Sequence, residues 1–314
     1  MSSRIPLIYG CGLFGKEGTL FAQIHDLEEC QKIIDGFTAR GHKIMDTSRV
    51  YGNGSSEEFL GLLDLNKAMV DTKAYPVTPG DAAPVKLRES LNTSIRVLGP
   101  YGRRIRVFFL HVPDRSVPFE ETLSEVDKMY RDGLFEEFGL SNFYCWEVAE
   151  IVAIAKARGW IRPTVYQGPH NALERDVESE LIPCLRKHGI RFHAYSPMAR
   201  GLLSGVKPIA ALHPIASARY SPYAAAFDRY VEILKKYHLT GAQVALRWIQ
   251  HHSQLTPDDA VIIGASTITQ LEENLDASEQ EPLPQELLDA LSELWMEHQG
   301  RAPSYAFPVV HRGK

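Results

Sequence analysis

The sequence has few cysteines, no surplus of positive charge and no long apolar run. Its 314 residues include four cysteines, and none of them forms a Cys-x-x-Cys pair: Cys11, Cys30, Cys145 and Cys184. Such wide spacing argues against a disulfide scaffold or a zinc site and is typical of proteins in a reducing compartment. We therefore expect a cytoplasmic protein without a metal, in which the thiols are packing residues.

The charge balance and the hydropathy exclude two classes of partner. Asp and Glu outnumber Lys and Arg by 39 to 34, so the chain has no surplus of basic residues to attract nucleic-acid phosphates or an anionic membrane. No stretch reaches the roughly 18 uncharged apolar residues of a membrane helix, and the first residues lack the apolar core of a signal peptide. We expect the partners to be small molecules rather than nucleic acids or membranes.

Short apolar runs alternate with longer segments of helical period along the whole chain. The expected strands are 7–9, 43–47, 69–74, 106–112, 135–141, 164–167, 191–196 and 260–265. The expected helices are 26–40, 56–64, 84–98, 120–132, 146–158, 176–188, 227–250 and 267–279. Eight unbroken βα units predict a closed parallel (β/α)₈ barrel of the TIM type, with residues 1–314 as one domain.

Turn residues agree with these boundaries. Glycines at positions 41, 133, 159 and 189 stand where a helix must stop before the next strand. The segments 55–58 and 267–270 are typical of capping boxes that open helices. The long irregular stretches 199–226 and 297–314 lie where loops of a barrel build the active site, so we expect them to act as lids.

A glycine-rich segment offers an alternative. Residues 10–15 match Gly-x-Gly-x-x-Gly directly after an apolar run, as in a Rossmann dinucleotide site. Helical periodicity begins only near Asp26, however, and the next strand ends in an acid, Asp46, about 30 residues on rather than the usual 20 or so. We therefore interpret the segment as a barrel loop.

Three successive strands end in an acid, an amine and an imidazole. Asp46 ends the second strand and is followed by Tyr51, Lys73 lies near the end of the third, and His111 ends the fourth. A carbonyl that receives a hydride becomes an alkoxide and needs a proton donor, which a phenol beside an ammonium can be. Taken singly, Asp46 and Lys73 could be a structural ion pair, and His111 could be a core residue. Together on one rim of a barrel, the four residues indicate catalysis.

These residues resemble the aldo-keto reductase superfamily, and its aflatoxin-aldehyde reductase branch in particular. Asp46-Thr-Ser-Arg-Val-Tyr51-Gly resembles the family's first signature, and Thr72-Lys73-Ala74 and Phe109-Leu-His111 resemble its strands that bear the Lys and the His. Further similar segments follow in order over residues 5–307, among them 139–142, 194–197, 201–205 and 263–274. The resemblance implies NADPH-dependent reduction of aldehydes, with ketones as further candidates.

The resemblance also implies a role for each matching residue. Asp46, Tyr51, Lys73 and His111 would form the catalytic tetrad, with Tyr51 as the general acid. The residues implied to bind the cofactor are Ser141, Asn142, Gln167, Tyr195, Ser196, Pro197, Gly201, Leu203, Gly205, Gly264, Ser266, Gln270, Glu273 and Asn274. Tyr195 would stack on the nicotinamide, and Ser266, Gln270, Glu273 and Asn274 would surround the adenosine end.

The sequence also departs from the family. Gly264 and Gln270 stand where many relatives have Lys and Arg near the adenosine phosphate, so Arg219 or Lys207 is our candidate for that charge. The C-terminal segment lacks an arginine that grips carboxylated substrates in animal members of the branch. We expect an apolar or aromatic mouth instead, lined by Tyr220, Tyr223, Tyr305 and Phe307.

Two other functions stay open at this stage. One is a regulatory nicotinamide-binding subunit with little turnover, similar to the potassium-channel β subunits of this superfamily. The other is an unrelated barrel isomerase or hydrolase that uses the same rim groups. Because relatives in the aflatoxin-aldehyde reductase branch are often dimers, we also expect a homodimer. The sequence does not identify the substrate.

Overall fold

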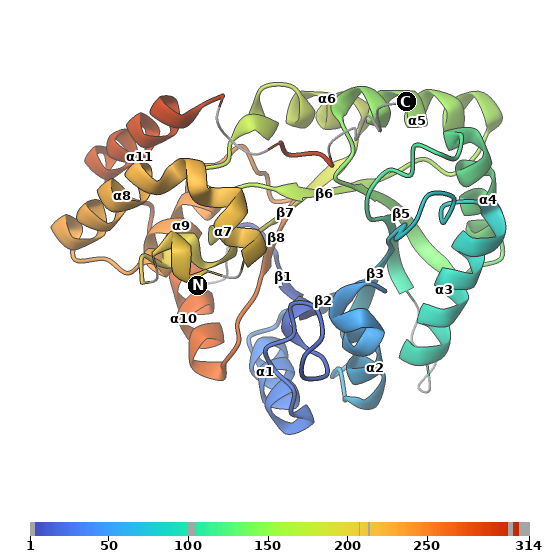
Figure 1. Ribbon diagram of the computed structural model, residues 1–314, viewed down its shortest axis with the longest axis horizontal. Helices are drawn as coiled ribbons and strands as arrows, with labels where there is room; N and C mark the ends of the chain where they lie inside the picture. The colour runs from blue at the N-terminus through green and yellow to red at the C-terminus, as the bar shows by residue number, and fades with distance from the viewer. Residues whose placement is uncertain (1–3, 100–104, 207, 213, 301–303, 308–314) are drawn as a thin grey trace.

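A computed structural model describes residues 4–99, 105–206, 208–212, 214–300 and 304–307. Within these residues the strands form one closed, all-parallel barrel in chain order, which confirms the predicted fold (Figure 1). The strands are Leu7–Gly10 (β1), Ile44–Asp46 (β2), Met69–Ala74 (β3), Ile105–Leu110 (β4), Phe135–Ser141 (β5), Val165–Pro169 (β6), Arg191–Tyr195 (β7) and Ala260–Ile263 (β8).

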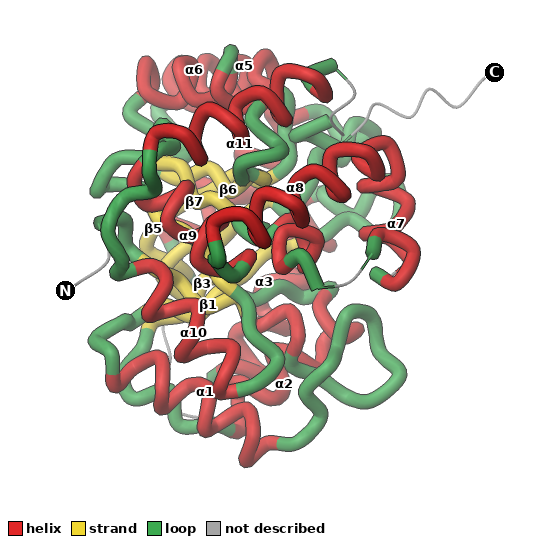
Figure 2. The backbone as a smooth tube through the Cα atoms, turned by 90° about the vertical axis from the view of Figure 1, so that its left-hand side faces the viewer, coloured by secondary structure: helices red, strands yellow, loops and turns green. Residues whose placement is uncertain are grey.

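Helices surround the barrel, so that the strands lie inside them in a second view (Figure 2). They are Leu27–Ala39 (α1), Ser55–Leu62 (α2), Pro84–Leu98 (α3), Phe119–Arg131 (α4), Cys145–Arg158 (α5), Leu181–His188 (α6), Pro214–Tyr220 (α7), Ala224–Tyr237 (α8), Gly241–His251 (α9), Ile268–Ser278 (α10) and Gln285–His298 (α11). None of the helices in the described part of the chain is long and apolar enough to span a bilayer.

The structure differs from the predicted helices and loops in the C-terminal half of the chain. The expected helix 227–250 is two helices, α8 and α9, because His238 ends α8 in the left-handed conformation and Thr240 caps α9. The stretch 199–226 is not irregular, since it holds α7 and three short 3₁₀ turns: Ala199–Ser204 (η4), Ile209–Ala211 (η5) and Ser221–Tyr223 (η6). A further helix, α11, was not among the predicted segments.

The predicted turn residues fare differently. The four helix-ending glycines all have positive φ, as predicted. The expected capping box at residues 55–58 is wrong: Gly54 is the N-cap of α2, and the Ser55 hydroxyl donates to the carbonyl of Gly52 instead. Position 54 favours glycine because its φ is 97°, a conformation that other residues rarely adopt, and the Arg49 guanidinium also lies where a Cβ would be.

The glycine-rich segment 10–15 forms a loop, as expected. It makes the single 3₁₀ turn Cys11–Leu13 (η1), and α1 begins only at Leu27. In a Rossmann site the helix that follows the glycines along the chain begins directly at them, whereas here residues 16–26 separate them from α1. This arrangement rules out the Rossmann alternative.

Asp259 is a buried carboxylate directly before β8, and it links α6, β7 and the loop that leads into β8. It receives hydrogen bonds from the Arg186 guanidinium of α6, from the backbone N–H of Phe192 in β7, at 2.7 Å, and from the backbone N–H of Thr256, at 2.7 Å. Replacing it by alanine would remove the partners of buried donors and of a charge. We expect Asp259→Ala to lower the free energy of unfolding by about 3 kcal/mol in urea titrations.

The pKa of Asp259 gives this prediction a pH signature. Burial alone would raise the pKa, but the hydrogen bonds from Arg186, Thr256 and Phe192 outweigh it and lower the pKa below 3.8. The stabilisation is therefore present above the ordinary carboxyl range and is lost as the pH falls below it. As a control, Asp276→Ala breaks an exposed pair with Arg40 and should cost less than about 1 kcal/mol. Equal losses in the two variants would contradict the role of Asp259.

Candidate active site

The four side chains predicted to act together do converge at the carboxyl ends of β2, β3 and β4. Lys73 Nζ donates to Asp46 Oδ2 at 2.6 Å and to the carbonyl oxygen of Thr47 at 2.7 Å. Tyr51 opens the turn Tyr51–Gly54 (η2), and its ring centroid lies 5.1 Å from Lys73 Nζ. The His111 ring meets the Tyr51 ring edge-on, with 5.6 Å between centroids.

Lys73 is fully buried and His111 is half-buried, and the two differ in charge. Burial alone would lower the pKa of Lys73, but Asp46 and Tyr51 outweigh it and raise the pKa, so the ammonium persists. Burial, with Lys73 and Arg200 nearby, lowers the pKa of His111 well below 6.5. The site therefore combines a permanent cation with a neutral imidazole at neutral pH.

Tyr51 keeps its proton in this environment. Burial raises the pKa of its phenol, Lys73 lowers it and Asp46 raises it, and the net result lies above 10. Lys73 thus acts in the expected direction, but burial is the larger effect. A phenol that stays protonated at neutral pH is suited to donate a proton.

Two hydrogen bonds around these groups were not predicted from the sequence. Gln167 Nε2 donates to Asp46 Oδ1 at 2.8 Å, so both oxygens of that carboxylate are engaged. Ser48 Oγ lies 2.9 Å from His111 Nδ1. Ser48 stands two residues after Asp46, but no sequence pattern shows which strand its hydroxyl reaches.

The ends of β5, β6 and β7 bring four of the predicted cofactor residues to the same rim. Register pairs Ser141 with Gln167, and β7 ends at Tyr195 beside Pro169. Asn142 has positive φ (62°), and its Oδ1 accepts a hydrogen bond from the Tyr195 hydroxyl at 2.8 Å. Its Nδ2 donates to the carbonyl oxygen of His111 at 2.9 Å, which ties this cluster to the four groups above.

Comparison with known proteins agrees with this geometry. A sequence model of the Aldo/keto reductase family matches residues 6–296, which is most of the chain. The chain belongs to the aldo/keto reductase family.

Relatives within the family are similar over most of their length. The human aldo-keto reductase family 7 member A3 is 39% identical over 87% of this chain and 90% of its own. The Monascus ruber aldo-keto reductase pigE is 35% identical over 93% and 94%, respectively. The human aflatoxin B1 aldehyde reductase member 4 is 38% identical over 87% and 90%. The chain is thus homologous to oxidoreductases of a family that typically uses NAD(P)H, and the predicted resemblance is confirmed.

The predicted pyrophosphate loop of this aldo/keto reductase follows β7 in an unusual backbone conformation. Residues with positive φ include Ser196 (55°), Arg200 (53°), Gly201 (93°) and Gly205 (71°), while Pro197 lies between the first two. Non-glycine residues rarely adopt such angles, and they cluster at functional sites. Leu203, by contrast, is fully buried and anchors the loop in the core.

The predicted adenosine residues gather where β8 meets α10. Thr267 caps the helix, and Gln270 Oε1 accepts hydrogen bonds from the N–H and the hydroxyl of Ser266, both at 2.9 Å. Asn274 Nδ2 donates to the carbonyl oxygen of Gly264 at 3.2 Å, whereas Glu273 is exposed. The expected capping box is half formed, since Gln270 binds Ser266 rather than Thr267.

Arg219 is not a free cation for an adenosine phosphate. Its guanidinium forms an ion pair with the buried Glu174, at 2.6 Å, and thereby ties α7 to the loop after β6. The Tyr220 hydroxyl donates to the same carboxylate at 2.8 Å. The other candidate, Lys207, lies outside the described residues.

The four residues expected to form an aromatic mouth lie in two places. Tyr220, the last residue of α7, and Tyr223, in η6, are buried against each other, with 6.2 Å between ring centroids. The Tyr305 hydroxyl donates to Glu180 Oε1 at 2.5 Å and accepts the N–H of Cys145. Phe307 is 39% exposed, and its N–H donates to the carbonyl oxygen of Asn142 at the rim.

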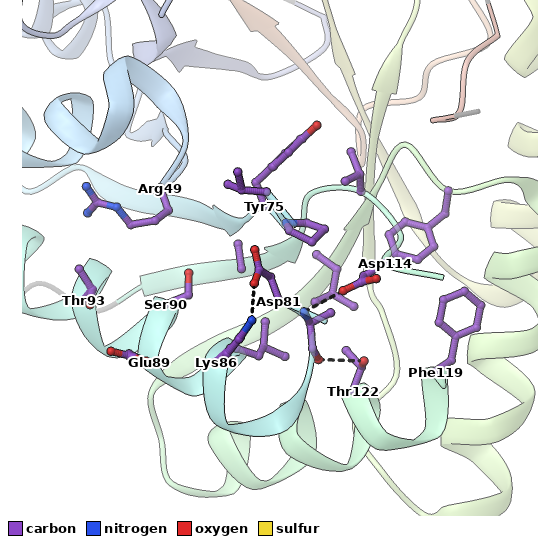
Figure 3. A pocket seen from close by; sticks show the side chains of 18 residues that line it. Arg49, Tyr75, Asp81, Lys86, Glu89, Ser90, Thr93, Asp114, Phe119 and Thr122 are labelled. Atoms are coloured by element: carbon purple, nitrogen blue, oxygen red, sulfur yellow. Dashed lines mark hydrogen bonds and ion pairs between the residues drawn. The ribbon is translucent and has the colours of Figure 1, made fainter. Parts of the chain in front are cut away.

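A cavity of about 350 Å³ lies behind β3 and β4 (Figure 3). Ala74 and Leu110 form part of its wall; each adjoins a catalytic candidate along its strand, so its side chain points away from the barrel axis. Asp81 and Lys86 pair at its edge, 2.8 Å apart. Tyr75 connects the cavity to the site, since its ring also stands edge-on to His111 at 5.3 Å.

Proposed function

We propose that the chain is an NADPH-dependent oxidoreductase that reduces aldehydes, and ketones as a wider class, to alcohols. The observation that supports this most is the convergence of Tyr51, Lys73, Asp46 and His111 at one end of the barrel. A phenol that holds its proton, beside a cation that would stabilise the phenolate, is suited to protonate an oxygen that gains negative charge.

The neighbouring residues fit a nicotinamide cofactor. Ser141, Asn142 and Gln167 bring a hydroxyl and two amides to the rim beside Tyr51, and these groups match the donors and acceptors of a carboxamide. Tyr195 adds an aromatic face, held by its hydrogen bond to Asn142. The capped start of α10 favours an anion, which suits the phosphates at the adenosine end.

Within this proposal each group of the chain has one task. Bound NADPH would supply the hydride that the carbonyl carbon receives. Tyr51 would give its proton to the carbonyl oxygen, and Lys73 would stabilise the phenolate left behind. Asp46 holds Lys73 charged and in place, and His111 would orient the carbonyl oxygen by a hydrogen bond.

An aldehyde is the first substrate class to test. Relatives named aflatoxin B1 aldehyde reductase are similar to this chain over most of its length. We further propose that residues 1–314 act as one barrel domain, which forms a homodimer.

A turnover assay with a panel of aldehydes and ketones tests this function. We expect aldehyde-dependent oxidation of NADPH, a slower reaction with NADH, and quenching of protein fluorescence when NADPH binds. Binding of NADPH without turnover of any aldehyde would favour a regulatory subunit instead. Absence of NADPH binding would contradict the proposal altogether and favour an unrelated barrel enzyme.

A further inference from the structure

Ser48 is a fully buried hydroxyl between two of the four proposed catalytic groups. Its Oγ lies 2.9 Å from Nδ1 of His111 and 3.2 Å from the carbonyl oxygen of Lys73. It comes from the segment after β2 and so connects the ends of β2, β3 and β4. Because Nδ1 is engaged by Ser48, Nε2 is the ring nitrogen left for a substrate.

The hydrogens in this contact can be counted. His111 is neutral, since burial and two nearby cations lower its pKa well below 6.5, so its ring carries one N–H. Only one hydrogen fits between Ser48 Oγ and Nδ1. Either Ser48 donates and the ring proton is on Nε2, or Nδ1–H donates and Nε2 presents a lone pair.

The surrounding hydrogen bonds favour donation by Ser48. The carbonyl oxygen of Lys73 already accepts the N–H of Arg49 at 3.1 Å, so it does not require the Ser48 proton. The N–H of Val50 points at Ser48 Oγ from 3.5 Å, on its acceptor side. Within the described part of the chain, Ser48 Oγ is the one polar partner of His111 Nδ1. The Ser48 hydroxyl also lies closer to this nitrogen than to the carbonyl oxygen of Lys73.

We propose that Ser48 donates its hydroxyl proton to His111 Nδ1 and so keeps the ring proton on Nε2, where it can be donated to a carbonyl oxygen. In the opposite tautomer two lone pairs, of Nε2 and of the substrate oxygen, would face each other. Ser48 is thus a positioning residue that acts through His111. The tautomer rests on the contacts and the environment of His111, whereas its use in catalysis rests on the proposed function.

Nitrogen NMR of ¹⁵N-histidine-labelled protein tests the tautomer without any cofactor. We expect the ring signals of His111, assigned by their loss in His111→Ala, to show a protonated Nε2. Ser48→Ala should shift them towards the Nδ1–H form or a mixture, and Ser48→Thr should keep the original pattern. A wild-type ring protonated on Nδ1, or an unchanged pattern in Ser48→Ala, would overturn the proposal. This result is independent of whether the protein reduces aldehydes.

Kinetics test the use of that tautomer. Removing one hydrogen bond to the imidazole should lower kcat with an aldehyde about tenfold, while the Kd of NADPH stays unchanged. Ser48→Thr should restore most of the rate. Ser56→Ala removes another buried hydroxyl, in α2, that contacts Thr47 and Cys11, and it should keep wild-type kcat.

A double-mutant cycle separates positioning from general destabilisation. In a His111→Ala background, Ser48→Ala should cause no further loss of kcat, because the residue through which it acts is gone. A second tenfold loss in that background would show that Ser48 supports the site in another way, and would refute the positioning role.

Discussion

Replacing Tyr51 by phenylalanine is expected to lower kcat for aldehyde reduction about a thousandfold. The change removes the proposed general acid but keeps the ring that packs edge-on against His111 and beside Lys73. Binding of NADPH should stay within about twofold of wild type, since the proposed cofactor residues lie on β5 to β7, in the loops after β5, β7 and β8, and on α10. Steady-state NADPH oxidation and fluorescence titration measure the two quantities.

A second phenol provides a matched control for this variant. Tyr75 also stands edge-on to the His111 ring, with 5.3 Å between centroids. It comes from the loop after β3, however, and lines the cavity shown in Figure 3. Tyr75→Phe should therefore keep kcat within about threefold of wild type. If Tyr51→Phe kept its turnover, or if both variants lost it equally, Tyr51 could not be the general acid.

The pH profile should follow the state of the same phenol. Because the pKa of Tyr51 lies above 10, a general acid at this position is protonated through neutral pH and loses its proton only in alkaline solution. The reductase rate should consequently fall on the alkaline side, and this fall should be absent from the residual rate of Tyr51→Phe.

The position of the catalytic candidates could be predicted because it follows from strand order alone. In a closed parallel barrel all strands end on one face, so Asp46, Lys73 and His111 meet once their strands are recognised. Their individual contacts do not follow from strand order. Gln167 donates to Asp46 from 121 positions further along the chain, and that pairing depends on how β6 is placed across the barrel.

Local signals failed where a residue adopted an unusual conformation. His238 ends α8 with φ of 53°, a role that the sequence predicts for glycine, so α8 and α9 were read as one helix. Ser55 looks like an N-cap, but Gly54 takes that position with φ of 97°, a conformation that favours glycine. In both places a backbone conformation with positive φ sets the helix boundary, and residue type alone did not reveal which residue adopts it.

The same limit applies to the proposed substrate mouth. Tyr220 is aromatic and lies in the long loop, which made it a natural candidate for the mouth. Its hydroxyl instead binds Glu174, together with Arg219, and the three residues hold α7 down. Charge pairing between distant segments decided this arrangement, and no spacing rule predicts it.

Replacing Lys73 by methionine should show whether its ion pair with Asp46 is structural or catalytic. Methionine keeps the length of the side chain but leaves the Asp46 carboxylate buried without its cation. We expect the free energy of unfolding to fall by about 3 kcal/mol, as for other broken buried pairs. We also expect kcat to fall at least a hundredfold, because the Tyr51 phenolate would form without a neighbouring positive charge.

The double variant Asp46→Asn, Lys73→Met separates these two losses. The neutral amide removes the unpaired charge and can still accept the hydrogen bond from Gln167, so part of the lost stability should return in urea titrations. Turnover should not return, since the ammonium beside Tyr51 is still missing. Recovery of both stability and kcat would mean that the pair serves only the fold, and that Tyr51 donates its proton without help from Lys73.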